Sequence, residues 1–178
     1  MASQRAGSKA LVWGPFLLFL FGLNSAVWAE AGEFQVKSAF VYNFLKFVTW
    51  KSNPTPEVIK VFFLGDGEFS EHLRAIQGRT IANHPIQVVP ITAITEVEDR
   101  SVLVISRSSK EKPEEISRFL AGQSVLTIGD SQEEGKQSVI FQFFTENEKI
   151  RFSIHLGNAQ AAGIHIDTRL LKLARIIP

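Results

Sequence analysis

The sequence of 178 residues contains no cysteine, and that absence removes several kinds of chemistry at once. Without a thiol there is no disulfide, no cysteine nucleophile and no cysteine-ligated metal. The fold must therefore be held together by its core alone. A domain of about 150 residues can do this, because it buries close to 70% of the surface that its unfolded chain exposes.

The sequence also lacks a large excess of either charge. Nineteen Lys and Arg residues stand against 18 Asp and Glu residues, for a net charge of +1. Domains that bind nucleic acid usually concentrate basic residues in a patch or stripe, and we find none. We therefore expect no nucleic-acid partner.

Short motifs that would specify a reaction are missing as well. The sequence has no phosphate-binding G-x-x-x-x-G-K segment and no G-x-S-x-G turn for a nucleophilic serine. The segment GDGEFS (65–70) begins like a dinucleotide-binding turn, but a serine stands where the third glycine belongs. No two histidines have the spacing of a zinc helix, although His155 and His165 could still meet in space. We expect no catalytic residue, no metal site and no cofactor; a hydrolase using His and Asp side chains is the weaker alternative.

What the sequence does have is an N-terminal segment typical of a secretory signal peptide. Arg5 and Lys9 supply its positive start, and residues 11–27 are almost wholly apolar. Ala29 or Ala31 then meets the small-residue rule for cleavage. An uncleaved membrane anchor is the alternative, but the apolar run is shorter than the roughly 20 residues of a spanning helix.

Removal of residues 1–29 would change the charge of the protein. It takes away two basic residues and no acid, which leaves 17 basic against 18 acidic residues, a net charge of about −1. We expect the remaining segment, residues 30–178, to be one domain that works in the periplasm with no membrane insertion after cleavage.

Hydrophobic periodicity in this segment predicts an α/β fold. Four strand-like runs alternate with helical segments, which favours a mostly parallel central sheet. A helix over 33–50 opens the domain; within its apolar arc lies Lys37, whose stem could reach outward to solvent. After the alternating part we expect a C-terminal antiparallel hairpin, with helices on both faces of the sheet. The strands are expected at 58–64, 86–91, 102–106 and 124–128, the hairpin at 138–145 and 149–156, and the other helices at 68–77, 112–121, 158–163 and 169–177.

Two of the predicted parallel strands end in a Gly-Asp pair. Asp66 follows one strand and Asp130 follows another. Ligands of open α/β sheets bind at the carboxyl ends of strands, so the two aspartates could form a ligand-binding crevice. The alternative, which we favour, is that each glycine makes a turn and each aspartate caps the following helix.

Two stretches of the sequence resemble the YfiR-like family of periplasmic proteins. KSAFVYNFLKFVTW (37–50) is close to the opening helix of that family. IRFSI (150–154), AAGI (161–164) and LLKLA (170–174) are close to its closing signature. The chain departs from the family at Lys51, where proline is usual, and it lacks the cysteines through which some members could be under redox control.

The resemblance implies a regulator that is not an enzyme. YfiR-like proteins bind the periplasmic sensor region of a membrane-bound diguanylate cyclase and repress it, which lowers cyclic-di-GMP and biofilm formation. The partner expected from the resemblance is therefore an inner-membrane diguanylate cyclase; a homodimer is left open, and no interface residue is carried over. The alternative function is a periplasmic domain that binds a small ligand in the strand-end crevice at Asp66 and Asp130.

Overall fold

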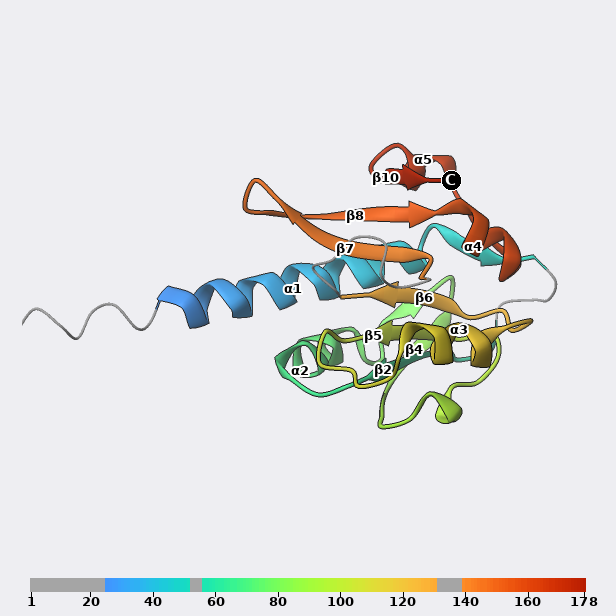
Figure 1. The fold of residues 1–178 in the computed structure, drawn as a ribbon, viewed down its shortest axis with the longest axis horizontal. Coiled ribbons are helices and arrows are strands. Elements are labelled where there is room, and N and C mark those ends of the chain that lie inside the picture. The colour runs from blue at the N-terminus through green and yellow to red at the C-terminus, as the bar shows by residue number, and fades with distance from the viewer. Residues whose placement is uncertain (1–24, 52–55, 131–138) are drawn as a thin grey trace, which may run out of the picture.

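The computed structural model describes residues 25–51, 56–130 and 139–178, in which helices alternate with the strands of a central sheet (Figure 1). Its strands are β1 (Val48–Trp50), β2 (Ile59–Leu64), β3 (Thr80–Ile81), β4 (His84–Ile91), β5 (Val102–Ile105), β6 (Leu126–Gly129), β7 (Phe141–Glu146), β8 (Lys149–His155), β9 (Ile164–Ile166) and β10 (Arg175–Ile177). Its helices are α1 (Ser25–Leu45), α2 (Glu68–Leu73), α3 (Pro113–Leu120), α4 (Leu156–Ala161) and α5 (Thr168–Leu171), with short 3₁₀ turns η1 (Arg74–Ile76) and η2 (Ile94–Glu96).

The central sheet has the strand order β10-β8-β7-β6-β5-β2-β4-β3. Strands β4, β2, β5, β6 and β7 run parallel to one another. β7 and β8 form an antiparallel hairpin, and β10 pairs with β8 in parallel. The mostly parallel sheet with a C-terminal hairpin, predicted from the alternation of strands and helices, is confirmed.

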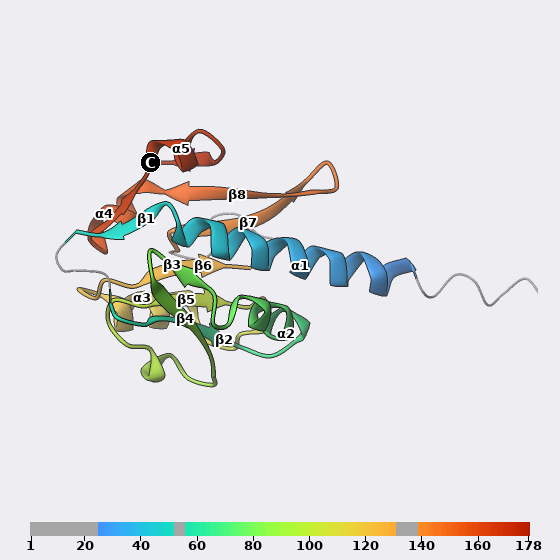
Figure 2. The same cartoon turned by 180° about the vertical axis from the view of Figure 1, so that it is seen from behind.

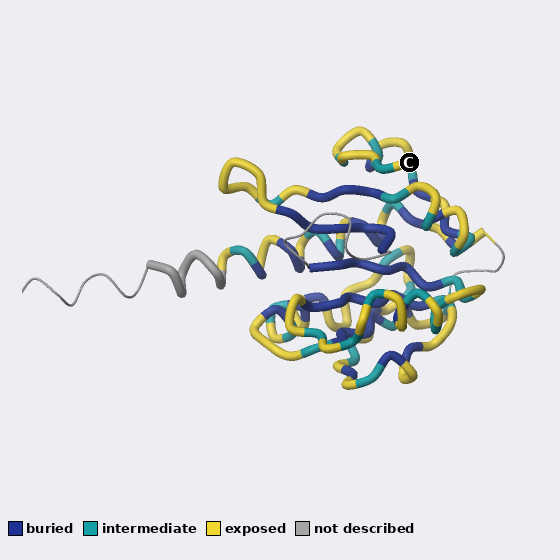
Figure 3. The backbone as a smooth tube through the Cα atoms, viewed as in Figure 1, coloured by how far each residue is buried: buried dark blue, intermediate teal, exposed yellow. Residues whose placement is uncertain are grey.

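Helices cover both faces of this sheet, as predicted (Figures 1 and 2). On one face α1 and α2 pack over an aromatic core in which Phe44 stacks on Phe141 with ring centroids 4.4 Å apart. On the other face α3 places Ile116 against Leu103 and Ile105. All four residues of β5 are buried, as expected of a parallel strand covered on both sides. Burial therefore follows the middle of the sheet, while the loops and hairpin tip are exposed (Figure 3).

The first helix ends earlier than the sequence predicts. We expected a helix through Trp50, but α1 stops at Leu45 and residues 48–50 form β1. β1 pairs antiparallel with β9, with Val48 opposite Ile166. The β-branched residues Val48 and Thr49 favour this extended conformation, and the pairing buries Val48 and Trp50. β1 thereby fixes the C-terminal end of α1 to the last third of the chain.

The last predicted helix is likewise interrupted. A helix over 169–177 was expected, but α5 covers only Thr168–Leu171 and β10 follows. Asp167 caps α5, because its Oδ1 accepts a hydrogen bond from the Arg169 N–H at 2.8 Å. The two isoleucines of β10 then pair with β8, which they could not do if the helix continued through them.

Candidate functional site

The direction in which the chain winds through the sheet reverses between β2 and β5. After β2 the chain moves to β4 on one side; it then crosses back to β5 on the other side and continues to β6. The connection after β2 leads to α2 on one face, and the connection after β5 leads to α3 on the opposite face. Such a reversal leaves a crevice outside the carboxyl ends of the two strands, where open α/β sheets bind their ligands.

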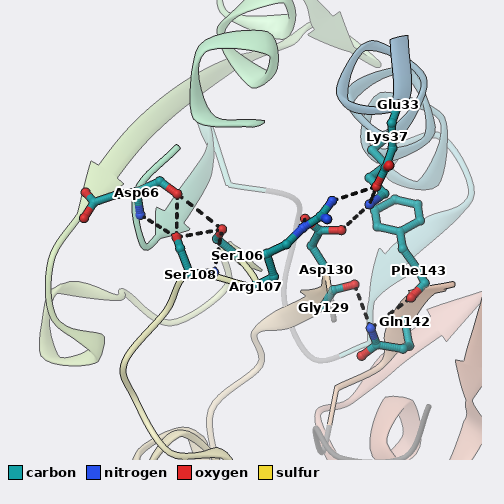
Figure 4. A network of polar contacts seen from close by, with 10 residues as sticks. All are labelled: Glu33, Lys37, Asp66, Ser106, Arg107, Ser108, Gly129, Asp130, Gln142 and Phe143. Atoms are coloured by element: carbon teal, nitrogen blue, oxygen red, sulfur yellow. Dashed lines mark hydrogen bonds and ion pairs between the residues drawn. The ribbon is translucent and has the colours of Figure 1, made fainter. Parts of the chain in front are cut away.

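Serine hydroxyls tie the two strand ends at this reversal together (Figure 4). The Asp66 N–H donates to Ser108 Oγ at 2.9 Å, and that hydroxyl donates back to the Asp66 carbonyl oxygen. Ser106 Oγ lies 3.0 Å from Ser108 Oγ. Gly65 has a φ of +112°, and a Cβ there would lie 3.0 Å from Ser106 Cβ and Ser108 Oγ. Only glycine fits this close approach without strain.

A cavity of about 350 Å³ opens beside this junction; we call it the strand-end cavity. Its lining comes from the carboxyl ends of β2 and β4 and the loop after β5: Leu64, Gly65, Asp66, Ile91, Thr92, Ser108, Ser109, Lys110 and Glu111. Asp66 is exposed, and in Figure 4 its carboxylate points away from Ser108. Asp66 does not cap α2, because the N-cap is Gly67 and no side chain bonds to the helix end there.

Asp130, at the carboxyl end of β6, lies in a different environment. Together with Glu33, Lys37 and Arg107 it forms what we call the charged cluster (Figure 4). Lys37 donates hydrogen bonds to both Glu33 and Asp130. Arg107 Nη2 lies 2.7 Å from Glu33 Oε1, and its Nε lies 3.4 Å from Asp130 Oδ2. Only 3% of Lys37 and 2% of Asp130 is exposed.

The charged cluster balances two cations against two carboxylates. Burial alone would raise the pKa of Glu33, but the hydrogen bond and charge of Lys37 and the charge of Arg107 outweigh it and hold that pKa below 4.5. Burial would also lower the pKa of Arg107, but the charges of Asp130 and Glu33 outweigh it and raise that pKa above its ordinary value. Both shifts favour the charged forms of Glu33 and Arg107, and the cluster's ion pairs pin α1 to the ends of β5 and β6.

Sequence reasoning found Asp130 but not its partners. Lys37 was expected to reach outward to solvent, and it instead points into the fold, where its ammonium lies 5.7 Å and 5.9 Å from the ring centroids of Phe34 and Phe143. The available signal was the i, i+4 spacing of Glu33 and Lys37 on a helix with a wide apolar arc. Arg107, two residues after the end of β5, gave no comparable signal.

The structure does not bring Asp66 and Asp130 into one crevice. Asp66 lines the strand-end cavity, whereas Asp130 is absent from its lining and is enclosed by the charged cluster. The two ends are separated by β5, the strand between β2 and β6. Whether either aspartate contacts a ligand remains a prediction, and the geometry offers such a role to Asp66 alone.

The two histidines that could have met in space, His155 and His165, lie on different strands. His155 ends β8 and His165 lies in β9. Within the described residues, no three His, Cys, Asp or Glu side chains come together as they would around a metal ion.

A scan against known protein families matches residues 34–175. The chain belongs to the YfiR/HmsC-like family. The match begins in α1, beside the charged cluster, and ends in β10, so it spans both the sheet and the strand-end cavity. A search of curated proteins finds no significant match to the chain.

Membership of the YfiR/HmsC-like family places the chain among periplasmic regulators of diguanylate cyclase signalling. The family is regulatory and not catalytic. None of the helices in the part of the chain that the structure describes is long and apolar enough to cross a membrane.

Proposed function

We propose that this protein is a periplasmic repressor that binds the periplasmic sensor region of an inner-membrane diguanylate cyclase and lowers its output of cyclic-di-GMP. The observation that carries the proposal is the family match over residues 34–175, which covers nearly the whole domain. The signal-like segment supports it, because cleavage after Ala29 or Ala31 would release the domain on the side of the membrane where the sensor region lies.

Repression of this kind requires no catalytic residue. A protein that binds the inactive state of its partner more tightly than the active state shifts the equilibrium by the difference in affinity. A difference of about 1.4 kcal/mol already changes the ratio of the two states tenfold. We propose accordingly that the protein is not an enzyme and acts by protein binding alone.

The test is a deletion of the gene in a strain that expresses the partner cyclase. We expect cyclic-di-GMP and biofilm to rise and the intact gene to restore both. The matched control is a chain without residues 1–29, which is made in the cytoplasm and should fail to restore them although its domain is unchanged. Unchanged cyclic-di-GMP after deletion, or full restoration by the leaderless chain, would contradict the proposal.

The predicted processing can be checked on the same strain. N-terminal sequencing of the protein from the periplasmic fraction should begin at Glu30 or Gly32. A chain that keeps Arg5 and Lys9 and stays with the membrane fraction would instead favour an uncleaved anchor.

A further inference from the structure

The strand-end cavity is lined by no residue of the charged cluster, it forms without a partner protein, and its lining carries charged side chains. We propose that it binds a small organic cation that carries a primary ammonium group. This goes beyond the repressor function, because neither the cavity nor its lining needs a bound cyclase in order to form. The argument rests on where the cavity lies, on the charges around it and on the rigidity of its walls.

The location is the one at which an open α/β sheet offers a ligand site. The cavity lies at the reversal between β2 and β5, where the following connections lead to opposite faces. Its volume of about 350 Å³ falls at the lower end of the range of about 300–1,000 Å³ seen for ligand pockets. The ligand is therefore small, with only a few carbon atoms.

The charges of the lining favour a cation. The lining includes two acidic residues, Asp66 and Glu111, and one basic residue, Lys110. No ion pair involves Asp66 or Glu111 within the described residues, so neither carboxylate is neutralised by the fold. Glu111 accepts only a long hydrogen bond, at 3.4 Å from the Ile94 N–H. An ammonium group would give both carboxylates a charge-assisted partner.

The neighbouring helices disfavour the anions that usually bind at such a place. In dinucleotide-binding folds a helix N-terminus and a glycine-rich turn hold the phosphate groups. Here the first turn of α2 carries Glu68 and Glu71, and the first turn of α3 carries Glu114 and Glu115. These four carboxylates oppose the positive ends of the two helix dipoles, so a phosphate or carboxylate ligand would meet repulsion.

The walls are already in place without a ligand. The Ser108 hydroxyl accepts a hydrogen bond from the Asp66 N–H and donates one to the Asp66 carbonyl oxygen. These bonds fix the main chain of Asp66 and leave its carboxylate available to another partner. The Ser109 N–H donates to the Ser106 carbonyl oxygen at 3.0 Å, and the Glu111 N–H donates to Ser109 Oγ at 3.3 Å. Preorganised walls reduce the ordering cost of binding.

The floor of the cavity can take the carbon chain of the ligand. Leu64 and Ile91 lie at the carboxyl ends of β2 and β4, and both are buried. An alkylamine would place its methylene groups against these side chains and its ammonium at Asp66 and Glu111. The hydroxyl of Thr92 lies on the same lining and can accept a further hydrogen bond from the ammonium.

The experiment is a calorimetric titration of the purified exported protein, with no cyclase present, so a failure of the repressor proposal does not affect it. The probes are n-butylamine and two ligands of the same length without positive charge, n-butyrate and n-butanol. We expect n-butylamine to bind with roughly millimolar affinity and the other two to bind at least about tenfold more weakly. Equal or tighter binding of n-butyrate, or no binding of n-butylamine, overturns the proposal.

Three variants locate the binding. Asp66→Asn, and separately Glu111→Gln, should each weaken n-butylamine binding about tenfold or more, because each removes a charge-assisted hydrogen bond without changing the shape of the lining. Lys110→Gln should strengthen it a few-fold by removing the like charge. The matched control is Glu148→Gln, an exposed acid in the turn of the β7–β8 hairpin, which should change nothing.

Two results decide against the site. If Asp66→Asn and Glu111→Gln, checked as folded by thermal unfolding, bind like Glu148→Gln, the amine binds elsewhere. If a lysine blocked at both its amino and carboxyl groups binds about tenfold more tightly than n-butylamine, the cavity takes a lysine side chain of another protein and not a free amine. Equal or weaker binding of the blocked lysine supports the small ligand.

Discussion

Replacing Asp130 with asparagine should lower the free energy of unfolding by about 3 kcal/mol. Removal of one member of a buried ion pair usually costs about 3–5 kcal/mol, since the remaining charge is left uncompensated. Here the low end applies, because Lys37 keeps its second carboxylate, Glu33, whose side chain is 22% exposed. The amide can still accept a hydrogen bond, but it supplies no negative charge to Lys37 and Arg107.

The companion substitution is Lys37→Met, which removes the buried ammonium and keeps the unbranched stem. Alone it should cost less than Asp130→Asn, because Asp130 retains Arg107 at 3.4 Å and Arg107 is partly exposed. The double variant removes both the ammonium of Lys37 and the carboxylate of Asp130, and the remaining charges, Glu33 and Arg107, still pair with each other. The double variant should therefore be more stable than the sum of the two single losses predicts, by about 1 kcal/mol or more.

The assay is urea unfolding followed by tryptophan fluorescence. Trp50 is a suitable probe, because it is 8% exposed and its Nε1 donates to the Ser124 carbonyl oxygen at 2.8 Å. With a slope of about 2 kcal/mol per molar urea, a loss of about 3 kcal/mol shifts the midpoint by about 1.5 M. Equal slopes among the variants would show that only stability has changed.

The control is an ion pair of the same chemistry at the surface. Lys60 and Glu98 lie 2.6 Å apart, but their side chains are 36% and 57% exposed. Lys60→Met and Glu98→Gln should each cost less than about 1 kcal/mol. If Asp130→Asn costs no more than Glu98→Gln, or if the losses of Lys37→Met and Asp130→Asn simply add, the charged cluster does not hold α1 as we argue.

Three further measurements follow from the structure. The pKa of Glu33 in the folded protein is below its unfolded value of 4.5, so ionised Glu33 stabilises the fold above that pH and this stabilisation is lost as the pH falls. The urea midpoint of the protein should therefore drop between about pH 5 and about pH 3. The drop should be smaller in Glu33→Gln, which has no carboxylate to protonate. Gly65→Ala should destabilise by about 1 kcal/mol more than Gly78→Ala in urea unfolding: both glycines have positive φ, but only Gly65 has neighbours within 4 Å. Phe44→Ala should cost about 3–5 kcal/mol by the same assay, since its ring is fully buried.

The alternating part of the fold could be predicted because its strands depend on local pattern. Runs such as residues 102–105 are apolar throughout and short, which is typical of a parallel strand buried on both faces. The strands that were missed are short: β1 and β10 have three residues each, and β3 has two. β1 and β10 depend on pairing with β9 and β8, and β1 lies more than a hundred residues from its partner in the sequence. A window along the chain cannot contain that information.

The candidate site was predictable in part for the same reason. The Gly-Asp pairs marked two strand ends correctly, because glycine and aspartate favour turns. The two aspartates differ in the elements that the fold places beside them. β6 lies beneath α1, so Asp130 meets Lys37, whereas β2 ends beside β4 and the loop after β5, so Asp66 meets solvent and the strand-end cavity. No local feature of the two dipeptides distinguishes these outcomes.

For the predicted signal peptide, the charged cluster limits which cleavage positions are compatible with the fold. Glu33 bridges Lys37 and Arg107, so a cut beyond Glu33 would leave two buried or half-buried cations to share Asp130 alone. Such a product would carry the uncompensated charge that makes Asp130→Asn costly. Cleavage after Ala29 or Ala31 keeps Glu33 and places the new N-terminus within one helical turn of it. Both predicted cleavage positions therefore preserve the contact between α1 and the sheet.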